Sequence, residues 1–233
     1  METKATLLLV IGFTLAGVGL LPQAQAVSPP PDGGYLGGNT AEGQNALLSL
    51  TTGTYNTAVG LFSLRTNTEG NFNTAIGAGT LLLNTADENT ATGAGALLSN
   101  TVGTQNTANG AFALFSNTEG AFNEANGIVA LYQNTTGSLN TANGYQALNQ
   151  NTGGNYNTAN GSLALRDNSN GQGNTASAYG ALANSTGFGN TALGFNAGAN
   201  VTTADNVICI GAGGGDVDDS CYIDNIFNQT GGT

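Results

Sequence analysis

Four acidic residues form the densest group of carboxylates in the sequence: Asp216, Asp218, Asp219 and Asp224. Carboxylate oxygens are ligands that calcium prefers, and the preceding run Gly213-Gly214-Gly215 resembles glycine-aspartate calcium loops, although it occurs only once. A solvated turn is the simpler interpretation, because clustered acids among glycines are typical of exposed loops. If the cluster does bind calcium, Asp216, Asp218 and Asp219 are the candidate ligands, and no other cofactor is expected.

The remaining composition argues against catalysis. The chain has no histidine and only one lysine, Lys4, so the commonest general bases are missing. Paired carboxylates also fail, because nothing near the aspartate cluster would raise one pKa and hold the other down. The many glycines recur throughout the chain and none is followed by the lysine and hydroxyl residue of a phosphate-binding loop. We expect a protein that is not an enzyme.

Aromatic residues provide the other candidate site. Tyr55, Phe72, Phe122 and Tyr156 share one position in a repeated pattern of seventeen residues. Their rings could pack on a neighbouring repeat, on a second subunit or on a sugar ring. The structural interpretations are favoured, because the sequence supplies no obvious polar partners that would orient a sugar.

The elements that must position these residues are tandem repeats. Ten copies follow the pattern N-T-A-x-G-x-x-A-L-x-x-N-T-x-G-x-x, and they are spaced by seventeen or sixteen residues. The copies open at Asn39, Asn56, Asn73, Asn89, Asn106, Asn123, Asn140, Asn157, Asn174 and Asn190.

This period predicts an all-β fold, a parallel β-solenoid or β-roll with about seventeen residues per coil and ten or more coils. Helical repeats need roughly 33 residues or more, and each unit here contains glycine, asparagine and threonine, which favour turns. Two short strands per coil are expected, one over N-T-A-x-G and one over x-x-A-L-x. At about 4.8 Å per coil, ten coils give a rod of about 48 Å.

Three columns of equivalent residues indicate what lies inside. Leucine occupies the ninth position in nine of ten copies and is predicted to form the buried spine. The small residue before it, usually alanine, should point the other way, because side chains alternate along a strand. The fourth position is apolar near both ends and asparagine in the middle, which predicts either a hydrogen-bonded asparagine ladder in a narrow interior or a solvated face.

The chain divides into four segments. Residues 1–26 read as a signal peptide, with Lys4, an apolar stretch from Ala5 to Leu21 and the cleavage pattern Ala24-Gln25-Ala26. A Pro/Gly-rich leader follows over residues 27–38, then the repeat domain over 39–205, then terminal coils and a tail over 206–233. No membrane span is expected after signal removal. These features predict an extracellular or cell-surface location.

The net charge argues against nucleic acid as a partner, and the positions of the two cysteines bear on whether they form a disulfide. The net charge of −11, with Arg65 and Arg166 as the basic residues outside the signal, makes nucleic acid an unlikely partner. Export favours a disulfide between Cys209 and Cys221. Their register opposes it, because Cys209 aligns with the third position of the repeat and Cys221 with the second, and neighbouring positions face opposite ways.

The strings Asn56-Thr57-Ala58-Val59-Gly60 and Asn73-Thr74-Ala75-Ile76-Gly77 resemble the head repeats of trimeric autotransporter adhesins. Longer units such as residues 140–156 are similar to repeat regions of bacterial surface and phage tail-fibre proteins that carry an endosialidase-type intramolecular chaperone domain, a domain absent here. The resemblance covers residues 39–227, and the family's own circuits are shorter than seventeen residues. It implies a β-roll used for attachment and built as a homotrimer.

The expected function is that of a secreted or cell-surface structural or adhesive protein, which attaches to a host surface or a glycan through a rigid, multivalent β-roll. A polysaccharide-binding solenoid, with Tyr55, Phe72, Phe122 and Tyr156 as ligand contacts, is the first alternative. An ice- or surface-binding solenoid using the threonines at the second position, or a filament subunit, is the second alternative.

Overall fold

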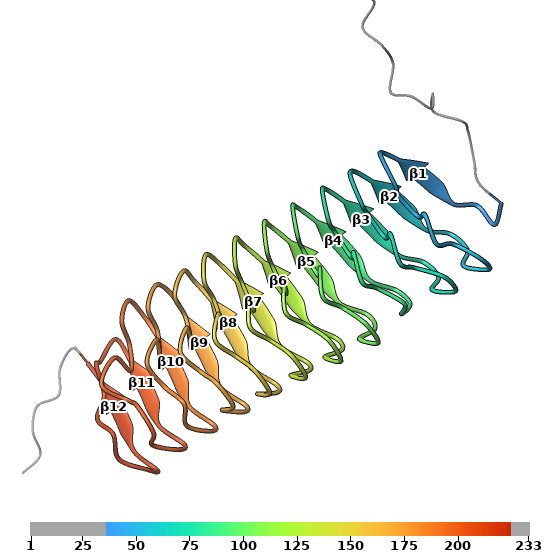
Figure 1. Cartoon of the computed structure of the whole chain (residues 1–233). Helices are drawn as coiled ribbons and strands as arrows, with labels where there is room; N and C mark the ends of the chain where they lie inside the picture. Colours follow the sequence, from blue (N-terminus) through green and yellow to red (C-terminus); the bar gives the residue numbers. More distant parts are fainter. Residues whose placement is uncertain (1–35, 225–233) are drawn as a thin grey trace, which may run out of the picture. The chain divides into compact units, whose positions relative to one another are not determined.

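The computed structural model describes residues 36–224, which form a parallel β-solenoid and contain no helix (Figure 1). Strands of three residues lie side by side in chain order, each paired in parallel with the next. The strands are β1 (Thr40–Glu42), β2 (Thr57–Val59), β3 (Thr74–Ile76), β4 (Thr90–Thr92), β5 (Thr107–Asn109), β6 (Glu124–Asn126), β7 (Thr141–Asn143), β8 (Thr158–Asn160), β9 (Thr175–Ser177), β10 (Thr191–Leu193), β11 (Ile208–Ile210) and β12 (Cys221–Ile223). The predicted fold class is therefore confirmed. The predicted signal peptide, most of the leader and the tail beyond residue 224 lie outside the described residues.

The register of the strands follows the repeat. Thr57 pairs with Thr74, one full unit later, and the same pairing runs through all ten predicted copies. Beyond them, Thr191 pairs with Ile208 and Ile208 pairs with Cys221, so the last circuit is shorter than the others. No helix among the described residues is long and apolar enough to cross a membrane.

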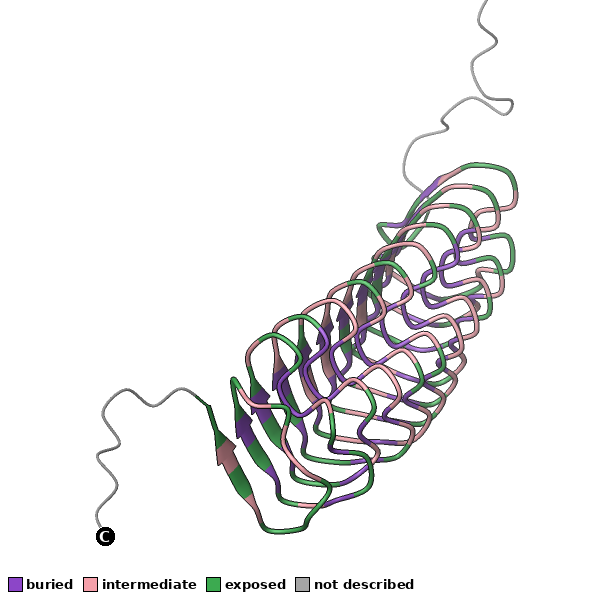
Figure 2. Ribbon diagram, turned by 90° about the vertical axis from the view of Figure 1, so that its left-hand side faces the viewer, coloured by how far each residue is buried: buried purple, intermediate pink, exposed green. Residues whose placement is uncertain are grey.

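Each strand from β1 to β11 buries its middle residue and turns the outer two outward, as the period of two requires, and the middle residue of β12, Tyr222, is half-buried. The middle residue is alanine from β1 to β10, and Cys209 takes its place in β11. From β2 to β9 this alanine is fully buried, whereas the residues on either side are exposed or half-buried (Figure 2). Alanine suits the position because its methyl group leaves room for the leucine that packs opposite.

The second strand predicted for each circuit is wrong. The segment x-x-A-L-x forms turns, and its leucine adopts a left-handed backbone, with φ of 51° at Leu114 for example. Side chains alternate only along extended backbone, so the expected opposition of alanine and leucine fails with it. Ala113 and Leu114 are both fully buried, and the leucine column forms the spine of the core from Leu47 to Leu182. The left-handed conformation costs a leucine about 1–2 kcal/mol, which burial of its side chain offsets.

A buried asparagine ladder stands at the first position of the repeat. The Oδ1 atom of Asn106 accepts hydrogen bonds from the backbone N–H and the side-chain amide of Asn123, at 3.0 and 3.1 Å. The amide of Asn106 itself donates to the carbonyl of Gly120 at 2.8 Å. Because the same contacts recur from circuit to circuit, these buried amides have partners along the solenoid.

A second buried ladder stands at the twelfth position, from Asn67 to Asn168. Asn117 donates to Oδ1 of Asn100 at 2.8 Å and to the carbonyl of Gly120 at 2.9 Å. The series of hydrogen bonds between these asparagines is interrupted at Asn67 and Asn168, whose buried Oδ1 atoms accept no hydrogen bond. Each of these residues precedes a sixteen-residue circuit, in which the missing residue shortens the corner after the twelfth position.

Glycine at the fifth position is required by geometry. Gly60 has φ of 128°, and a Cβ atom there would lie 2.5 Å from the carbonyl oxygen of Gly77 in the next circuit. Stacked circuits approach too closely at this corner for any side chain. Ala178 is the exception among these positions, with φ of 108°.

Candidate functional site

The outward side of the sheet is the most regular surface of the solenoid. We call it the strand face, and define it as the side chains of the first and third residues of β1–β12. Threonine is the first residue in β1–β5 and β7–β10, and Glu124 replaces it in β6. These side chains point away from the core and are exposed or half-buried, so the threonine column is available to a partner.

The third residues of the central strands form a ladder at the surface. Asn109 donates to Asn126, Asn126 to Asn143, and Asn143 to Asn160, at 2.8–2.9 Å. The ladder predicted at the fourth position of the repeat is therefore present. It lies on the solvent side, so the expectation of a narrow interior there is wrong, because the alternation set by the buried alanine turns the fourth position outward.

Paired threonines on the strand face occur at one place. Only β4 carries threonine at both outward positions, Thr90 and Thr92, whereas the neighbouring β5 carries Thr107 and Asn109. Ice or surface binding through the threonine column stays a prediction, with measurement of thermal hysteresis as its test.

The predicted aromatic site is divided in the structure. Tyr55 and Phe72 stack, with ring centroids 5.1 Å apart and planes 13° from parallel, and their side chains are 61% and 57% exposed. Phe122 and Tyr156 are also exposed, but no other described aromatic ring stacks on either of them. Glu88 and Gln105 occupy the same position in the circuits between Phe72 and Phe122. The four residues therefore offer one pair and two separate rings.

Two further stacked aromatic pairs were missed from the sequence. Phe115 stacks on Tyr132 at 5.2 Å, and Tyr179 stacks on Phe195 at 5.4 Å. Each pair joins equivalent positions in neighbouring circuits, so the signal that could have found them is aromatic residues recurring one repeat apart. Such stacks are typical of stabilising contacts between circuits.

Asp216 closes the C-terminal end of the solenoid. Its Oδ1 atom accepts the backbone N–H groups of Thr202, Thr203 and Ala204, each at 2.8 Å. Its Oδ2 atom accepts the hydroxyl groups of both threonines, at 2.5 and 3.2 Å. These bonds, led by the Thr202 hydroxyl, hold the pKa of Asp216 well below its usual range.

The carboxylate takes the place of a carbonyl group. In the middle of the solenoid, the N–H groups of Thr118, Glu119 and Gly120 converge on the carbonyl oxygen of Thr135 in the next circuit, at 3.0–3.2 Å. The described circuit that follows residue 206 is short, because Ile208 pairs with Cys221, and Asp216 supplies the oxygen instead. An anion suits this site because three convergent N–H groups carry positive partial charge.

The candidate calcium ligands bind different groups of the protein. Asp218 accepts a hydrogen bond from the backbone N–H of Asp205 at 2.9 Å, and Asp219 accepts one from the side-chain amide of Asn206 at 3.0 Å. Asp216 instead accepts hydrogen bonds from residues 202–204. Within residues 36–224, no three acidic, histidine or cysteine side chains are placed to hold a metal ion. The three carboxylates thus form a set of caps, and calorimetric titration with calcium tests whether they also bind the ion.

The cysteines are free, and the conflict of register explains why. Cys209 pairs with Tyr222 across β11 and β12, whereas Cys221 pairs with Ile208. Cys209 is buried and Cys221 is exposed, so their side chains lie on opposite sides of the sheet. The disulfide that export favours is therefore absent, and the argument from register is confirmed. Burial raises the pKa of the Cys209 thiol.

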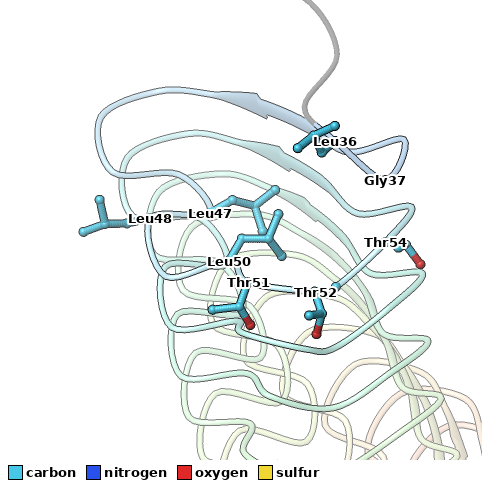
Figure 3. A pocket seen from close by; sticks show the side chains of 9 residues that line it. Leu36, Gly37, Leu47, Leu48, Leu50, Thr51, Thr52 and Thr54 are labelled. Carbon is cyan, nitrogen blue, oxygen red and sulfur yellow. The ribbon is translucent and has the colours of Figure 1, made fainter.

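A hollow of ≈ 480 Å³ opens at the first circuit and is lined by Leu36, Leu47, Leu50 and their neighbours. Figure 3 shows Leu47 and Leu50 pointing into the end of the solenoid, while Leu48 points away. Leu50 stands where later circuits carry the second asparagine ladder. An apolar side chain fits here because, within residues 36–224, no earlier circuit offers a partner to a ladder amide at this position.

Comparison with family models, curated proteins and solved structures finds no match to this chain. The homotrimer implied by the resemblance stays a prediction. One chain buries the leucine spine and both asparagine ladders by itself, so the described core needs no second copy to close it.

Proposed function

We propose that this protein is a secreted or cell-surface structural element that attaches to a surface without catalysing a reaction. The observation that carries the proposal is the strand face, where threonine recurs in register on nine of the first ten strands. Neighbouring strands are about 4.8 Å apart, so equivalent hydroxyl groups repeat at short, regular intervals. Weak contacts to a repetitive surface then add through multivalency.

The hydrogen bonds between circuits support the role of a rigid structural element. Buried amides at two positions of the repeat hydrogen bond from circuit to circuit, and the leucine spine is buried in the same core. Asp216 is an unsuitable general acid near neutral pH, because its hydrogen bonds keep its pKa low. The polar groups that could do chemistry instead hold the backbone together.

Removal of whole circuits tests attachment by multivalency. Deleting residues 106–139 removes two complete seventeen-residue units and joins Gln105 to Asn140 in register, so the remaining solenoid should fold. The full chain and the shortened chain are labelled and applied to glycan arrays and to arrays of extracellular matrix proteins. We expect the full chain to bind, and the shortened chain to bind more weakly than the lost fraction of circuits accounts for.

Deleting residues 140–173 is the matched control, because it removes two other complete units, none of them shared with residues 106–139, and joins Leu139 to Asn174 in register. Both deletions should weaken binding equally if the repeated face is the binding surface. A loss confined to one deletion would indicate a single local site, and absence of binding to every array surface would refute attachment.

A polysaccharide is the second candidate ligand, favoured by the exposed stack of Tyr55 and Phe72. Two parallel rings on neighbouring circuits offer an apolar surface on which sugar rings stack. Replacing both by alanine should abolish binding to glycan arrays if this stack is the site. Replacing Phe122 and Tyr156 by alanine is the control, since those rings stand alone, and an equal loss in both variants would contradict the assignment to the stack.

A further inference from the structure

The third residues of the strands form a sequence that reads nearly the same in both directions along the sheet. In strand order, from β2 to β11, they are Val59, Ile76, Thr92, Asn109, Asn126, Asn143, Asn160, Ser177, Leu193 and Ile210. Apolar residues stand at both ends, small hydroxyl residues come next, and four asparagines fill the middle. The centre of this symmetry lies between β6 and β7, which is also the middle of the sheet.

From this symmetry we propose that the strand face is an interface between two copies of this chain, which pack face to face with their solenoids antiparallel. This pairing covers the threonine column that the proposed attachment uses, so attachment through that column requires the dissociated single copy. A two-fold axis parallel to the strands, between β6 and β7, places each strand opposite the partner's strand at the same distance from the centre. An isologous interface requires a surface that complements itself under the two-fold rotation, and the third-residue column meets this condition.

The resulting contacts of the third residues match in character from β2 to β11, whereas Glu42 of β1 faces the equivalent of Ile223 in β12. Val59 of one copy faces the equivalent of Ile210 in the other, and Ile76 faces the equivalent of Leu193. These four side chains are 37–53% exposed in the single chain, so pairing them removes apolar surface from water. In the middle, the asparagine ladder faces a second asparagine ladder, and its amides already hold one another in place.

The threonine column follows the same symmetry in three of its strand pairs, whereas Glu124 faces the equivalent of Thr141 and Thr57 faces the equivalent of Ile208. The rotation places Thr74 opposite the equivalent of Thr191, Thr90 opposite Thr175 and Thr107 opposite Thr158. Hydroxyl groups that face each other can both donate and accept, so these pairs leave no donor without an acceptor. The face therefore combines apolar contact near its ends with hydrogen bonding in its centre.

Other arrangements of the same face fit less well. In a parallel pair with the axis along the solenoid, the first residue of each strand meets the third residue of the same strand, so Ile76 faces Thr74. Around a three-fold axis, the three copies of Glu124 would gather at one level, as would those of Glu42. Like charges brought together in this way disfavour association. The antiparallel pair brings together only two copies of Glu124, about one strand spacing apart and each opposite Thr141, and it keeps the copies of Glu42 at opposite ends of the interface.

The size of the face is sufficient for a stable dimer. Twelve strands about 4.8 Å apart and about 10 Å long give roughly 550 Å² per copy before the flanking side chains are counted. Both copies together then bury more than about 1,100 Å², which exceeds the minimum of about 1,000 Å² for a specific interface.

The oligomeric state and its response to charge provide the test. Sedimentation and light scattering on the purified chain, from about 1 to about 100 µM, should show two copies per particle. Ile76→Lys or Leu193→Glu alone should weaken the dimer by about 100-fold or more, because each places two unpaired charges against apolar side chains. Both positions are exposed in the single chain, so circular dichroism should show unchanged folding.

Combining Ile76→Lys with Leu193→Glu identifies the orientation. In the antiparallel dimer the introduced ammonium faces the introduced carboxylate of the other copy, and association should recover by about 10-fold or more over either single variant. Within one copy the two positions are seven strands apart, about 34 Å, too far to interact. Leu83→Lys is the matched control, since Leu83 is 42% exposed and lies outside the strand face, and it should leave association unchanged.

Each other outcome overturns the proposal. A single copy at every concentration removes the dimer, and three copies replace it with the arrangement that the family resemblance implies. Two copies that tolerate Ile76→Lys as well as Leu83→Lys place the interface elsewhere. Loss of association in both single variants without recovery in the combination rules out the antiparallel orientation.

Discussion

Substitution of one asparagine in the second buried ladder tests whether these amides stabilise the fold. Asn134 donates to Oδ1 of Asn117 at 2.7 Å and to the carbonyl of Gly137 at 2.8 Å, and it accepts from Asn151 at 2.7 Å. In Asn134→Ala, the carbonyl of Gly137 keeps a second donor, Asn123. Oδ1 of Asn117 loses its partner, and one amide hydrogen of Asn151 loses its acceptor.

Two newly unpaired groups in a buried site cost about 1–3 kcal/mol each, so the free energy of unfolding should fall by about 2–6 kcal/mol. The same substitution at Asn84 should cost about half as much. In an unbroken ladder Asn84 would donate to Oδ1 of Asn67, but this atom already lacks a partner in the native protein. Asn84→Ala therefore newly leaves only an amide hydrogen of Asn100 unpaired.

Urea unfolding followed by circular dichroism measures both variants, with the slope of the transition as a check that the same surface is exposed. Leu131→Ala, in the same circuit, gives the scale of an apolar loss, about 2–5 kcal/mol. A loss below about 1 kcal/mol for Asn134→Ala, or equal losses at the two asparagines, would refute the reasoning.

Three further changes probe single features. Asp216→Asn should lower the thermal midpoint of unfolding at pH 7. Because the pKa of Asp216 is depressed in the native protein, the difference in midpoint from wild type should shrink as pH falls below about 4. A difference that does not depend on pH would contradict the role of the Asp216 carboxylate as a cap. Ala178→Gly should stabilise the chain by about 1 kcal/mol in urea unfolding, because it relieves the backbone strain of an alanine with φ of 108°. Gly161→Ala should destabilise the chain, because the added Cβ atom would lie 2.4 Å from the carbonyl oxygen of Ala178. A thiol reagent should modify Cys221 in the native protein and Cys209 only after unfolding, and rapid labelling of both would argue against burial of Cys209.

The repeat made much of the fold predictable. A period of seventeen residues is too short for a pair of helices, and stacking identical units in register places leucine on leucine and threonine on threonine. The same register reasoning anticipated that Cys209 and Cys221 face opposite ways. The aromatic residues and the aspartates were predictable as candidates, because both stand out from the surrounding pattern.

Local conformation was less accessible. Nothing in the residue type of Leu114 indicates a left-handed backbone, since that conformation is unfavourable for leucine in isolation. The recurring asparagines at the first and twelfth positions were interpreted as turn formers, which is what asparagine favours locally. The structure shows that they are buried, and that their amides hydrogen bond to circuits before and after their own.

The sequence by itself determined the period, the strand register and the identity of the leucine spine, because these depend only on which residues recur. The tertiary structure decided which polar columns are inside, how many strands each circuit has and what the aspartates do. Those outcomes depend on contacts between neighbouring circuits, where a hydrogen bond or a buried methyl group outweighs the preference of a single residue. Asp216 shows this most directly, since its role exists only because the following circuit is too short to supply a carbonyl oxygen.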